Sequence, residues 1–265
     1  MKELIKRIKR GVEDGLKSIS FVIGRGSAQP DDFPDFLGIG AQKSGTTWLH
    51  TCLIAHPEIY LPEEKEVHFF DWKYWKSYSW YRRKFIHAKG RLKGEITPAY
   101  GSITERRIRH IARMNPDLKV IYLLRNPIER AWSHSKMVLC KIQGRPFEDI
   151  SEGQWIAHFD GQKSEKRGSY TETYVKWSRV FGEERIFVGF YEQIKEDPEG
   201  LLKDIFRFLG RAEDVDMSLL PTAQKSNVGL QEEIPPHLRA YLHQKYATEI
   251  EACCARFGSW ACDWR

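Results

Sequence analysis

Short runs of consecutive apolar residues alternate with segments of helical periodicity along most of the chain. A fully apolar run is typical of a strand buried on both faces of a parallel sheet, and an apolar residue every three to four positions is typical of a helix packed on one side. We predict strands at 36–40, 120–124 and 185–190, and helices at 46–55, 174–181, 198–209 and 236–257. This alternation predicts a three-layer α/β sandwich with a mainly parallel central sheet.

The first 34 residues follow a different pattern. Residues 1–23 place apolar side chains such as Leu4, Ile8 and Val12 on one helical face and basic side chains on the other, which predicts an amphipathic basic helix. We expect this helix to dock onto the domain or a partner subunit, with peripheral membrane contact as the alternative. Residues 24–34 are rich in Gly, Ser, Pro and Asp and predict a linker. We therefore separate a helix and linker at 1–34 from the main domain at 35–265.

The charge balance favours an anionic ligand. The chain has 42 Lys and Arg against 36 Asp and Glu, a net charge of +6, and a pI near 9.0. A surplus of this kind favours phosphate or sulfate groups. The basic residues are interleaved with acidic ones and form no stripe, so we expect no nucleic acid partner.

Cysteine usage and hydropathy predict a cytoplasmic protein. The chain has five cysteines, at positions 52, 140, 253, 254 and 262, without the spacing of a zinc site. We expect reduced thiols, with a disulfide from Cys262 to Cys253 or Cys254 as the alternative. No apolar stretch reaches the roughly 18 residues that span a bilayer, and the N-terminus lacks an apolar signal core.

A glycine-containing loop at residues 40–49, Gly-Ala-Gln-Lys-Ser-Gly-Thr-Thr-Trp-Leu, lies between the first predicted strand and its helix. Backbone N–H groups and the helix dipole at this position bind phosphate. A nucleoside triphosphate loop has the pattern G-x-x-x-x-G-K-[ST], but here Lys43 lies inside the loop and Thr46 follows the second glycine. Arg125 also follows the 120–124 strand, where a magnesium-binding carboxylate would be expected. Both departures argue against phosphoryl transfer.

A second anion-binding pattern begins at that arginine. Arg125 ends a predicted strand, Pro127 is placed to start a helix, and Ser133 lies about two helical turns further on. The planar guanidinium of Arg125 and the hydroxyl of Ser133 are both suited to bind a phosphate.

Together the two patterns resemble those of the sulfotransferase family. The resemblance implies a P-loop NTPase-like fold and 3′-phosphoadenosine 5′-phosphosulfate (PAPS) as co-substrate, with 3′-phosphoadenosine 5′-phosphate (PAP) as product and no metal. It implies that Arg125 and Ser133 bind the 3′-phosphate, and that Lys43 contacts the oxygen between phosphorus and sulfur and stabilises the leaving phosphate. The implied 5′-phosphosulfate loop consists of Gln42, Lys43, Ser44, Gly45, Thr46, Thr47 and Trp48.

The segment 63–71 is rich in titratable groups and is strand-like in sequence. An acceptor that attacks sulfur loses a proton, so a carboxylate or imidazole must lie within hydrogen-bond reach. The run Lys-Glu-Val-His-Phe-Phe at 65–70 resembles the segment of heparan-type and bacterial sulfotransferases whose glutamate is the base. This makes Glu66 the favoured base, with His68 on the same strand face as assistant or substitute. Phenol and steroid sulfotransferases use a histidine, which keeps His68 as a competitor.

Further segments resemble parts of the family's nucleotide and acceptor sites. Residues 94–100 resemble an E-x-T-P-x-Y stretch on the acceptor side, where relatives often carry a lysine in place of Ile96. The resemblance places Tyr170 near the 3′-phosphate and Lys225 with Ser226 over the nucleotide. Aromatic residues at 72–81 are expected to contribute both to the core and to an acceptor pocket.

These patterns predict sulfuryl transfer from PAPS by in-line displacement. The acceptor would be a hydroxyl or amine of a small molecule or saccharide, and a protein tyrosine is also compatible. A small-molecule kinase with a divergent P-loop and a non-catalytic nucleotide-binding module are the alternatives. The sequence leaves the oligomeric state open.

Overall fold

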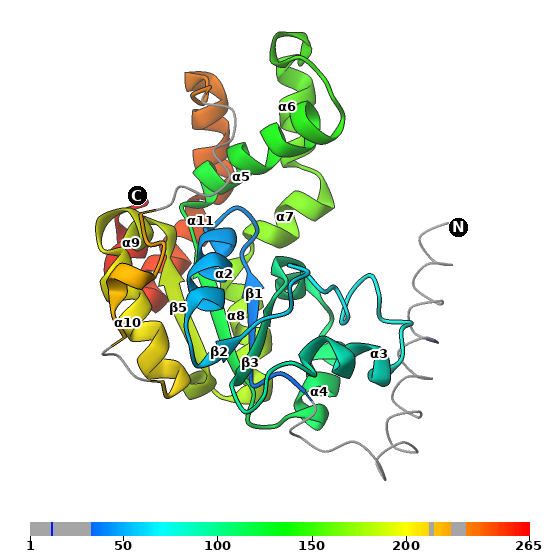
Figure 1. Cartoon of the computed structure of the whole chain (residues 1–265). Coiled ribbons are helices and arrows are strands. Elements are labelled where there is room, and N and C mark those ends of the chain that lie inside the picture. The colour runs from blue at the N-terminus through cyan, green and yellow to red at the C-terminus, as the bar shows by residue number, and fades with distance from the viewer. Residues whose placement is uncertain (1–11, 13–32, 212–214, 224–231) are drawn as a thin grey trace.

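The computed structural model describes residues 12, 33–211, 215–223 and 232–265 (Figure 1). The predicted N-terminal helix, except Val12, and the predicted nucleotide residues Lys225 and Ser226 lie outside these residues. The described strands form one sheet in the order β2-β3-β1-β4-β5, and every neighbouring pair is parallel. Their bounds are β1 Phe36–Gly40, β2 Ile59–Tyr60, β3 Leu92–Ile96, β4 Lys119–Leu124 and β5 Ile186–Phe190.

Helices cover both faces of this sheet, which confirms the three-layer prediction. Alternate residues of β1 and β4 point to opposite faces. Phe36, Ile121 and Leu123 pack with α2 (Thr46–Ala55) and α10 (Pro198–Leu209), whereas Leu37, Val120 and Tyr122 pack in the cluster on the other face. That second cluster includes residues of α4 (Glu105–Met114), α5 (Pro127–Lys136), α8 (Tyr170–Phe181) and α11 (Pro236–Phe257). The shorter helices are α3 Tyr78–Arg82, α6 Glu152–Phe159, α7 Gln162–Gly168, α9 Tyr191–Glu196 and α12 Ser259–Cys262.

The strand order brings three chain segments to one edge. In the sheet β1 lies between β3 and β4, with Gly38 opposite both Ile96 and Ile121. The carboxyl ends of parallel strands lie at the same edge, and ligands of open α/β sheets bind there. The loop after Gly40, the turn after Ile96 and Arg125 after β4 therefore meet.

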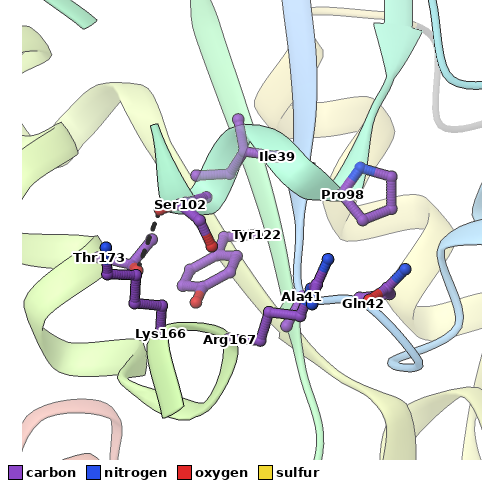
Figure 2. Close-up of a pocket in the computed structure, with 10 residues that line it drawn as sticks. Ile39, Ala41, Gln42, Pro98, Ser102, Tyr122, Lys166, Arg167 and Thr173 are labelled. Atoms are coloured by element: carbon purple, nitrogen blue, oxygen red, sulfur yellow. Dashed lines mark hydrogen bonds between the residues drawn. The ribbon is translucent and has the colours of Figure 1, made fainter. Parts of the chain in front are cut away.

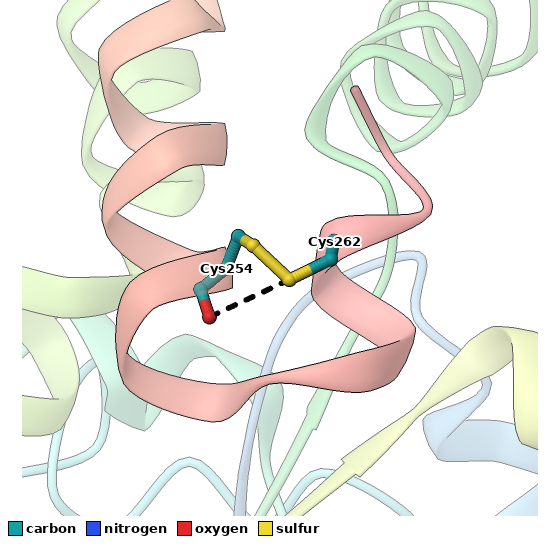
Figure 3. The surroundings of a disulfide bond; sticks show 2 residues. All are labelled: Cys254 and Cys262. Atoms are coloured by element: carbon teal, nitrogen blue, oxygen red, sulfur yellow. Dashed lines mark hydrogen bonds between the residues drawn. A yellow bond between two sulfur atoms is a disulfide. The ribbon is translucent and has the colours of Figure 1, made fainter.

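The C-terminal segment contains a disulfide, which corrects the prediction of reduced thiols. Helix α11 ends at Phe257, and Gly258, at φ 70°, reverses the chain into α12. This reversal brings the Cα atoms of Cys254 and Cys262 to 4.4 Å, and the two residues form a disulfide (Figure 3). The expectation of reduced thiols was wrong for this pair, and the alternative for Cys262 holds. Cys52, Cys140 and Cys253 are free.

Helix length and hydropathy bear on whether a helix can span a membrane. None of those within the described residues is long and apolar enough to cross a bilayer. In α11, which has 22 residues, charged side chains recur along the whole helix.

Candidate active site

The phosphate loop, residues 40–46, connects β1 to α2 (Figure 1). Gly45 precedes the first residue of α2 with φ 84°, and a Cβ there would lie 2.3 Å from Cδ1 of Ile194 in α9. Lys43 also has a left-handed backbone, with φ 74°, which is uncommon for a residue with a side chain. The tight turn presents the backbone of the loop at the N-terminus of α2, where an anion is stabilised.

Polar atoms in this loop fit a phosphate group. The side chain of Ser44 is fully buried, and its Oγ has no hydrogen-bond partner among the described residues. The Oε1 atom of Gln42 is likewise buried without a partner in the described part of the chain. An unpaired buried hydroxyl is destabilising unless a ligand or water satisfies it, and a phosphate oxygen accepts its hydrogen bond.

Arg125 is fixed against the phosphate loop from three sides. Its Nη1 donates to the Lys43 carbonyl at 3.2 Å, and its guanidinium lies 4.5 Å from the centre of the Tyr191 ring. The Tyr170 hydroxyl donates to the Arg125 carbonyl at 2.9 Å. Tyr170 is fully buried and supports the Arg125 backbone through this hydrogen bond. The support from Tyr191 was missed in the sequence, because its segment shows no chemical pattern.

The region around Lys43 is strongly cationic. Burial, followed by the charges of Arg125, Lys141 and Lys136, lowers the pKa of Lys43. Ser133 is half-buried on α5, the same helix that provides Lys136. Positive charge of this density favours an anionic ligand with several charged oxygens.

The acidic loop, residues 63–71, is not the strand that its sequence pattern predicts. Glu66 and His68 both have left-handed backbones, with φ 64° and 59°, and neither lies in a strand. Val67, Phe69 and Phe70 are buried, and the apolar pattern therefore reflects a loop packed into the core. The predicted proximity is nevertheless present, since His68 Nε2 lies 3.4 Å from Glu66 Oε2.

A third residue completes this arrangement. Nδ1 of His68 lies 2.9 Å from Oδ2 of Asp71, and Lys65 Nζ lies 2.8 Å from Oε1 of Glu66. Asp71 was missed as a site residue, although its position three residues after His68 is the available signal. The imidazole is thus bracketed by two carboxylates.

The charge states of these groups separate the two candidate bases. Burial alone would raise the pKa of Glu66, but hydrogen bonds from His68 and Lys65 lower it to about 2. Burial alone would lower the pKa of His68, but its bonds to Asp71 and Glu66 raise it to about 9. At neutral pH Glu66 is therefore a carboxylate with free lone pairs, and His68 is an imidazolium with no lone pair to accept a proton. These charge states favour Glu66 as the base.

The acidic loop lies close enough to the phosphate loop for their charges to interact. The charge of Lys65 contributes to the lowered pKa of Lys43, and the charge of Glu66 acts on Arg167 of α7. Arg167 and Gln42 line a small hollow that is partly open to solvent (Figure 2). Pro98 and Ser102 from the turn after β3 form another wall of this hollow.

The aromatic segment divides as expected between core and surface. Tyr74 and Tyr81 are buried, whereas the side chains of Trp72 and Trp75 are 71% and 69% exposed. The Trp72 indole stacks on the His68 ring with centroids 4.0 Å apart and an interplanar angle of 8°. One face of Trp72 thus covers the imidazole while most of its surface remains exposed.

The fold and the site together define an α/β protein with a nucleotide-type phosphate loop, an arginine in place of the metal-binding carboxylate and an ion-paired carboxylate in a loop nearby. The sequence model of the family described as "Sulfotransferase domain" matches residues 33–227. The chain belongs to the sulfotransferase family, which confirms the resemblance and the P-loop-like fold.

Curated relatives and solved structures agree with this assignment. Heparan sulfate glucosamine 3-O-sulfotransferase 6 of Mus musculus is 33% identical over 67% of this chain and 52% of its own length, and the 3B1 enzyme of Homo sapiens is 32% identical over 72% and 49%. The chain thus spans about half the length of the curated relatives it matches.

A sulfotransferase from Alicyclobacillus acidocaldarius superposes with a TM-score of 0.71 at 25% identity, over 88% of this chain and 98% of its own. Mouse sulfotransferase SULT7A1, solved in complex with PAP, shares the fold with a TM-score of 0.56 at 18% identity, over 89% of each chain.

Proposed function

We propose that this protein transfers a sulfuryl group from PAPS to a hydroxyl or amine of a saccharide or small-molecule acceptor. The observation that carries the proposal is the meeting of two loops at one sheet edge. The lysine-containing phosphate loop comes from β1, and the Glu66–His68–Asp71 cluster faces it from the acidic loop. The first loop suits an anionic leaving group and the second suits an acceptor that loses a proton.

The donor side of the site fits the nucleotide. Ser44 has an unpaired buried hydroxyl in the phosphate loop, and Arg125 is held at the adjacent strand end. These residues would bind the 5′- and 3′-phosphates respectively, with Ser133 as the second ligand of the 3′-phosphate. PAPS would supply the sulfuryl group, which passes to the acceptor as PAP leaves. Lys43 would stabilise the charge that develops on the departing phosphate.

On the acceptor side, Glu66 would take the proton of the attacking group. Its ion pairs with His68 and Lys65 hold the carboxylate charged and oriented before the acceptor arrives. Asp71 holds the opposite nitrogen of His68 and thereby fixes the ring. Exclusion of water by a bound acceptor would raise the proton affinity of Glu66 at the moment of transfer.

A saccharide acceptor has the stronger support. The curated relatives are named as enzymes of heparan sulfate glucosamine. An exposed indole next to the base, as Trp72 provides, suits stacking against the apolar face of a sugar ring. Ile96 is buried between the sheet and α2, so this position presents no side chain to an acceptor.

The kinase alternative is not favoured, because the fold matches sulfotransferases and Arg125 stands where a kinase of this fold needs a metal-binding carboxylate. Calorimetric titration with PAP, and with ATP plus magnesium as control, tests the donor. We expect micromolar binding of PAP alone. Preference for ATP with magnesium would overturn the proposal.

Transfer itself is tested with ³⁵S-labelled PAPS and heparan sulfate oligosaccharides, with p-nitrophenol as a small-molecule acceptor. Labelled oligosaccharide is the expected product. Exclusive labelling of the phenol would indicate that the acceptor is a small molecule and not a saccharide.

A further inference from the structure

A buried carboxylate lies behind the acidic loop. Glu95, near the end of β3, is 1% exposed and accepts three hydroxyl hydrogen bonds. Tyr81 and Tyr100 donate to its Oε1 at 2.5 and 3.0 Å, and Thr97 donates to its Oε2 at 2.8 Å. Within the described residues no cation pairs with Glu95, so these hydroxyls alone compensate the burial of its charge.

Two of the three hydroxyls also contact backbone N–H groups of the acidic loop. The backbone N–H of Phe70 donates to the Tyr100 hydroxyl at 3.2 Å, and that of His68 approaches Thr97 Oγ1 at 3.5 Å. A hydroxyl has one hydrogen to donate. With the hydrogens of Thr97 and Tyr100 directed to a charged Glu95, their oxygens remain free to accept from the loop backbone.

The charge of Glu95 determines which groups donate and which accept in this hydrogen-bond network. An ionised carboxylate only accepts hydrogen bonds, whereas a protonated carboxyl or an amide also donates. A donor at position 95 would force at least one of the three hydroxyls to turn its hydrogen away from this side chain. When that hydroxyl is Thr97 or Tyr100, its hydrogen competes with the N–H group of the loop around the same oxygen, and this attachment of the loop weakens.

We propose that Glu95 is a positioning residue whose negative charge holds the acidic loop, and with it Glu66 and His68, against the phosphate loop. The inference rests on the proposed function, since positioning matters only if Glu66 acts on an acceptor. It deepens that function by adding a residue that touches neither donor nor acceptor.

The charged groups around Glu95 permit titration near neutral pH. Burial raises the pKa of Glu95 to about 7 against the lowering effect of the three hydroxyls, and the charge of Asp71 adds to the rise. Tyr81 and Tyr100 stay neutral, because burial raises the pKa of both. The neighbouring charges are His68, paired with Asp71, and Arg107 of α4, which donates to the Phe70 and Asp71 carbonyls at 3.0 and 3.1 Å.

This arrangement predicts an acid limb in the pH profile, that is, a decrease of kcat toward low pH. As pH falls through about 7, Glu95 takes up a proton and becomes a donor, so kcat should decrease. Glu66, with a pKa of about 2, remains charged over this range, and His68, with a pKa of about 9, remains protonated. Neither member of the pair would produce a limb near pH 7.

The decisive variant is Glu95→Gln, which keeps the shape and removes the charge. With labelled PAPS and a heparan sulfate oligosaccharide, we expect kcat at pH 8 to fall at least tenfold and the acid limb near pH 7 to disappear. The Kd of PAP should stay within twofold, which also shows that the variant is folded. Wild-type kcat with an unchanged acid limb would overturn the proposal.

Tyr81→Phe is the matched control, because it removes only the hydroxyl that donates to Glu95 and keeps the ring that stacks on Phe69 with centroids 4.2 Å apart. Loss of this donor should move the acid limb to higher pH and leave kcat at pH 9 within twofold of wild type. Tyr100→Phe removes the attachment of Phe70 and should lower kcat while the acid limb persists. Equal effects of Tyr81→Phe and Tyr100→Phe on kcat would contradict the directional argument.

A readout without an acceptor separates this inference from the proposed function. NMR titration of ¹⁵N-labelled histidines in the PAP-bound protein should give a His68 pKa that drops toward 6.5 in Glu95→Gln, because the loop no longer holds His68 against both carboxylates. An unchanged His68 pKa would refute the positioning role. Absence of PAP binding and of transfer in the wild type would instead refute the proposed function.

Discussion

The donor half and the acceptor half of the site are built in different ways. The donor half consists of segments that follow β1 and β4 directly, so the sheet fixes Lys43 and Arg125 through backbone that is itself hydrogen-bonded. The acceptor half is a loop without regular structure. Its attachments include backbone N–H bonds to the Thr97 and Tyr100 hydroxyls and hydrogen bonds from Arg107 to two loop carbonyls. Phe69 and Phe70 are also buried.

This difference indicates which residues of each half can be substituted while the half keeps its position. A loop that joins a strand to a helix must keep its glycine and its tight turn, because Ile194 leaves no space for a Cβ at Gly45. A loop held by a few side chains keeps its position as long as those bonds persist, whatever its exposed residues are. We therefore expect donor chemistry to be fixed by the fold and acceptor preference to be set by exposed residues such as Trp72.

Glu66→Gln should have the largest effect, because it removes the proton acceptor and leaves the donor half intact. We expect kcat to fall roughly 10³-fold, as for loss of a general base. The Kd of PAP, measured by calorimetry, should remain near the wild-type value. Glu63→Gln, an exposed position in the same loop, serves as control. Retained turnover in Glu66→Gln would transfer the role of base to another group.

Lys43→Ala tests the donor half at the reacting centre. Loss of the cation at the leaving phosphate should lower kcat by about 10²-fold, in the range of a lost oxyanion contact. PAP binding should weaken less than turnover, since Arg125 and the loop backbone remain. Turnover and calorimetry of Lys203→Ala, an exposed lysine on α10, provide the reference. A larger loss of binding than of turnover would mark Lys43 as a binding residue.

Arg125→Ala should weaken the binding of PAP. Charge-assisted hydrogen bonds contribute about 1.5–3 kcal/mol, so the Kd of PAP should rise roughly ten- to hundredfold. Because the contact is ionic, added salt should weaken PAP binding less in the variant than in the wild type. Equal PAP affinity of Arg125→Ala and wild type would rule out the 3′-phosphate assignment, with Arg109→Ala as the surface control.

Trp72→Ala should have a smaller effect, confined to the acceptor half. Loss of one stacking contact of about 0.5–1.5 kcal/mol predicts a two- to tenfold higher KM for an oligosaccharide acceptor, with kcat little changed. Trp75→Ala is a matched control, since Trp75 is equally exposed and is covered by Lys76 at 4.1 Å instead of by His68. The same KM in both variants and wild type would exclude Trp72 as an acceptor platform.

Removal of the disulfide should leave both halves active. Cys254→Ser opens a loop with a sequence separation of 8 residues. Chain entropy then predicts a loss of roughly 2–3 kcal/mol in unfolding free energy, measured by urea unfolding with Cys253→Ser as control.

The sequence predicts the donor half well, because its signals are local. Apolar runs, with glycine and proline at their ends, predict β1, α2 and α11 with their observed limits, and the phosphate loop therefore lies where its sequence places it. The acceptor half depends on contacts between distant residues. Nothing near Glu66 indicates left-handed backbone, and the attachment of Phe70 to Tyr100 spans 30 residues. The Cys254–Cys262 disulfide likewise depends on the turn at Gly258, which a count of cysteines does not show.

The stack of Trp72 on His68 gives the protein an internal optical reporter. A protonated imidazole in contact with an indole quenches its fluorescence, whereas a neutral imidazole quenches much less. With ring centroids 4.0 Å apart, the emission of Trp72 should therefore brighten as His68 loses its proton at alkaline pH. Subtracting the spectrum of Trp72→Phe isolates this signal from the other tryptophans. The charge state beside Glu66 can then be followed in solution without isotopes, during binding and turnover.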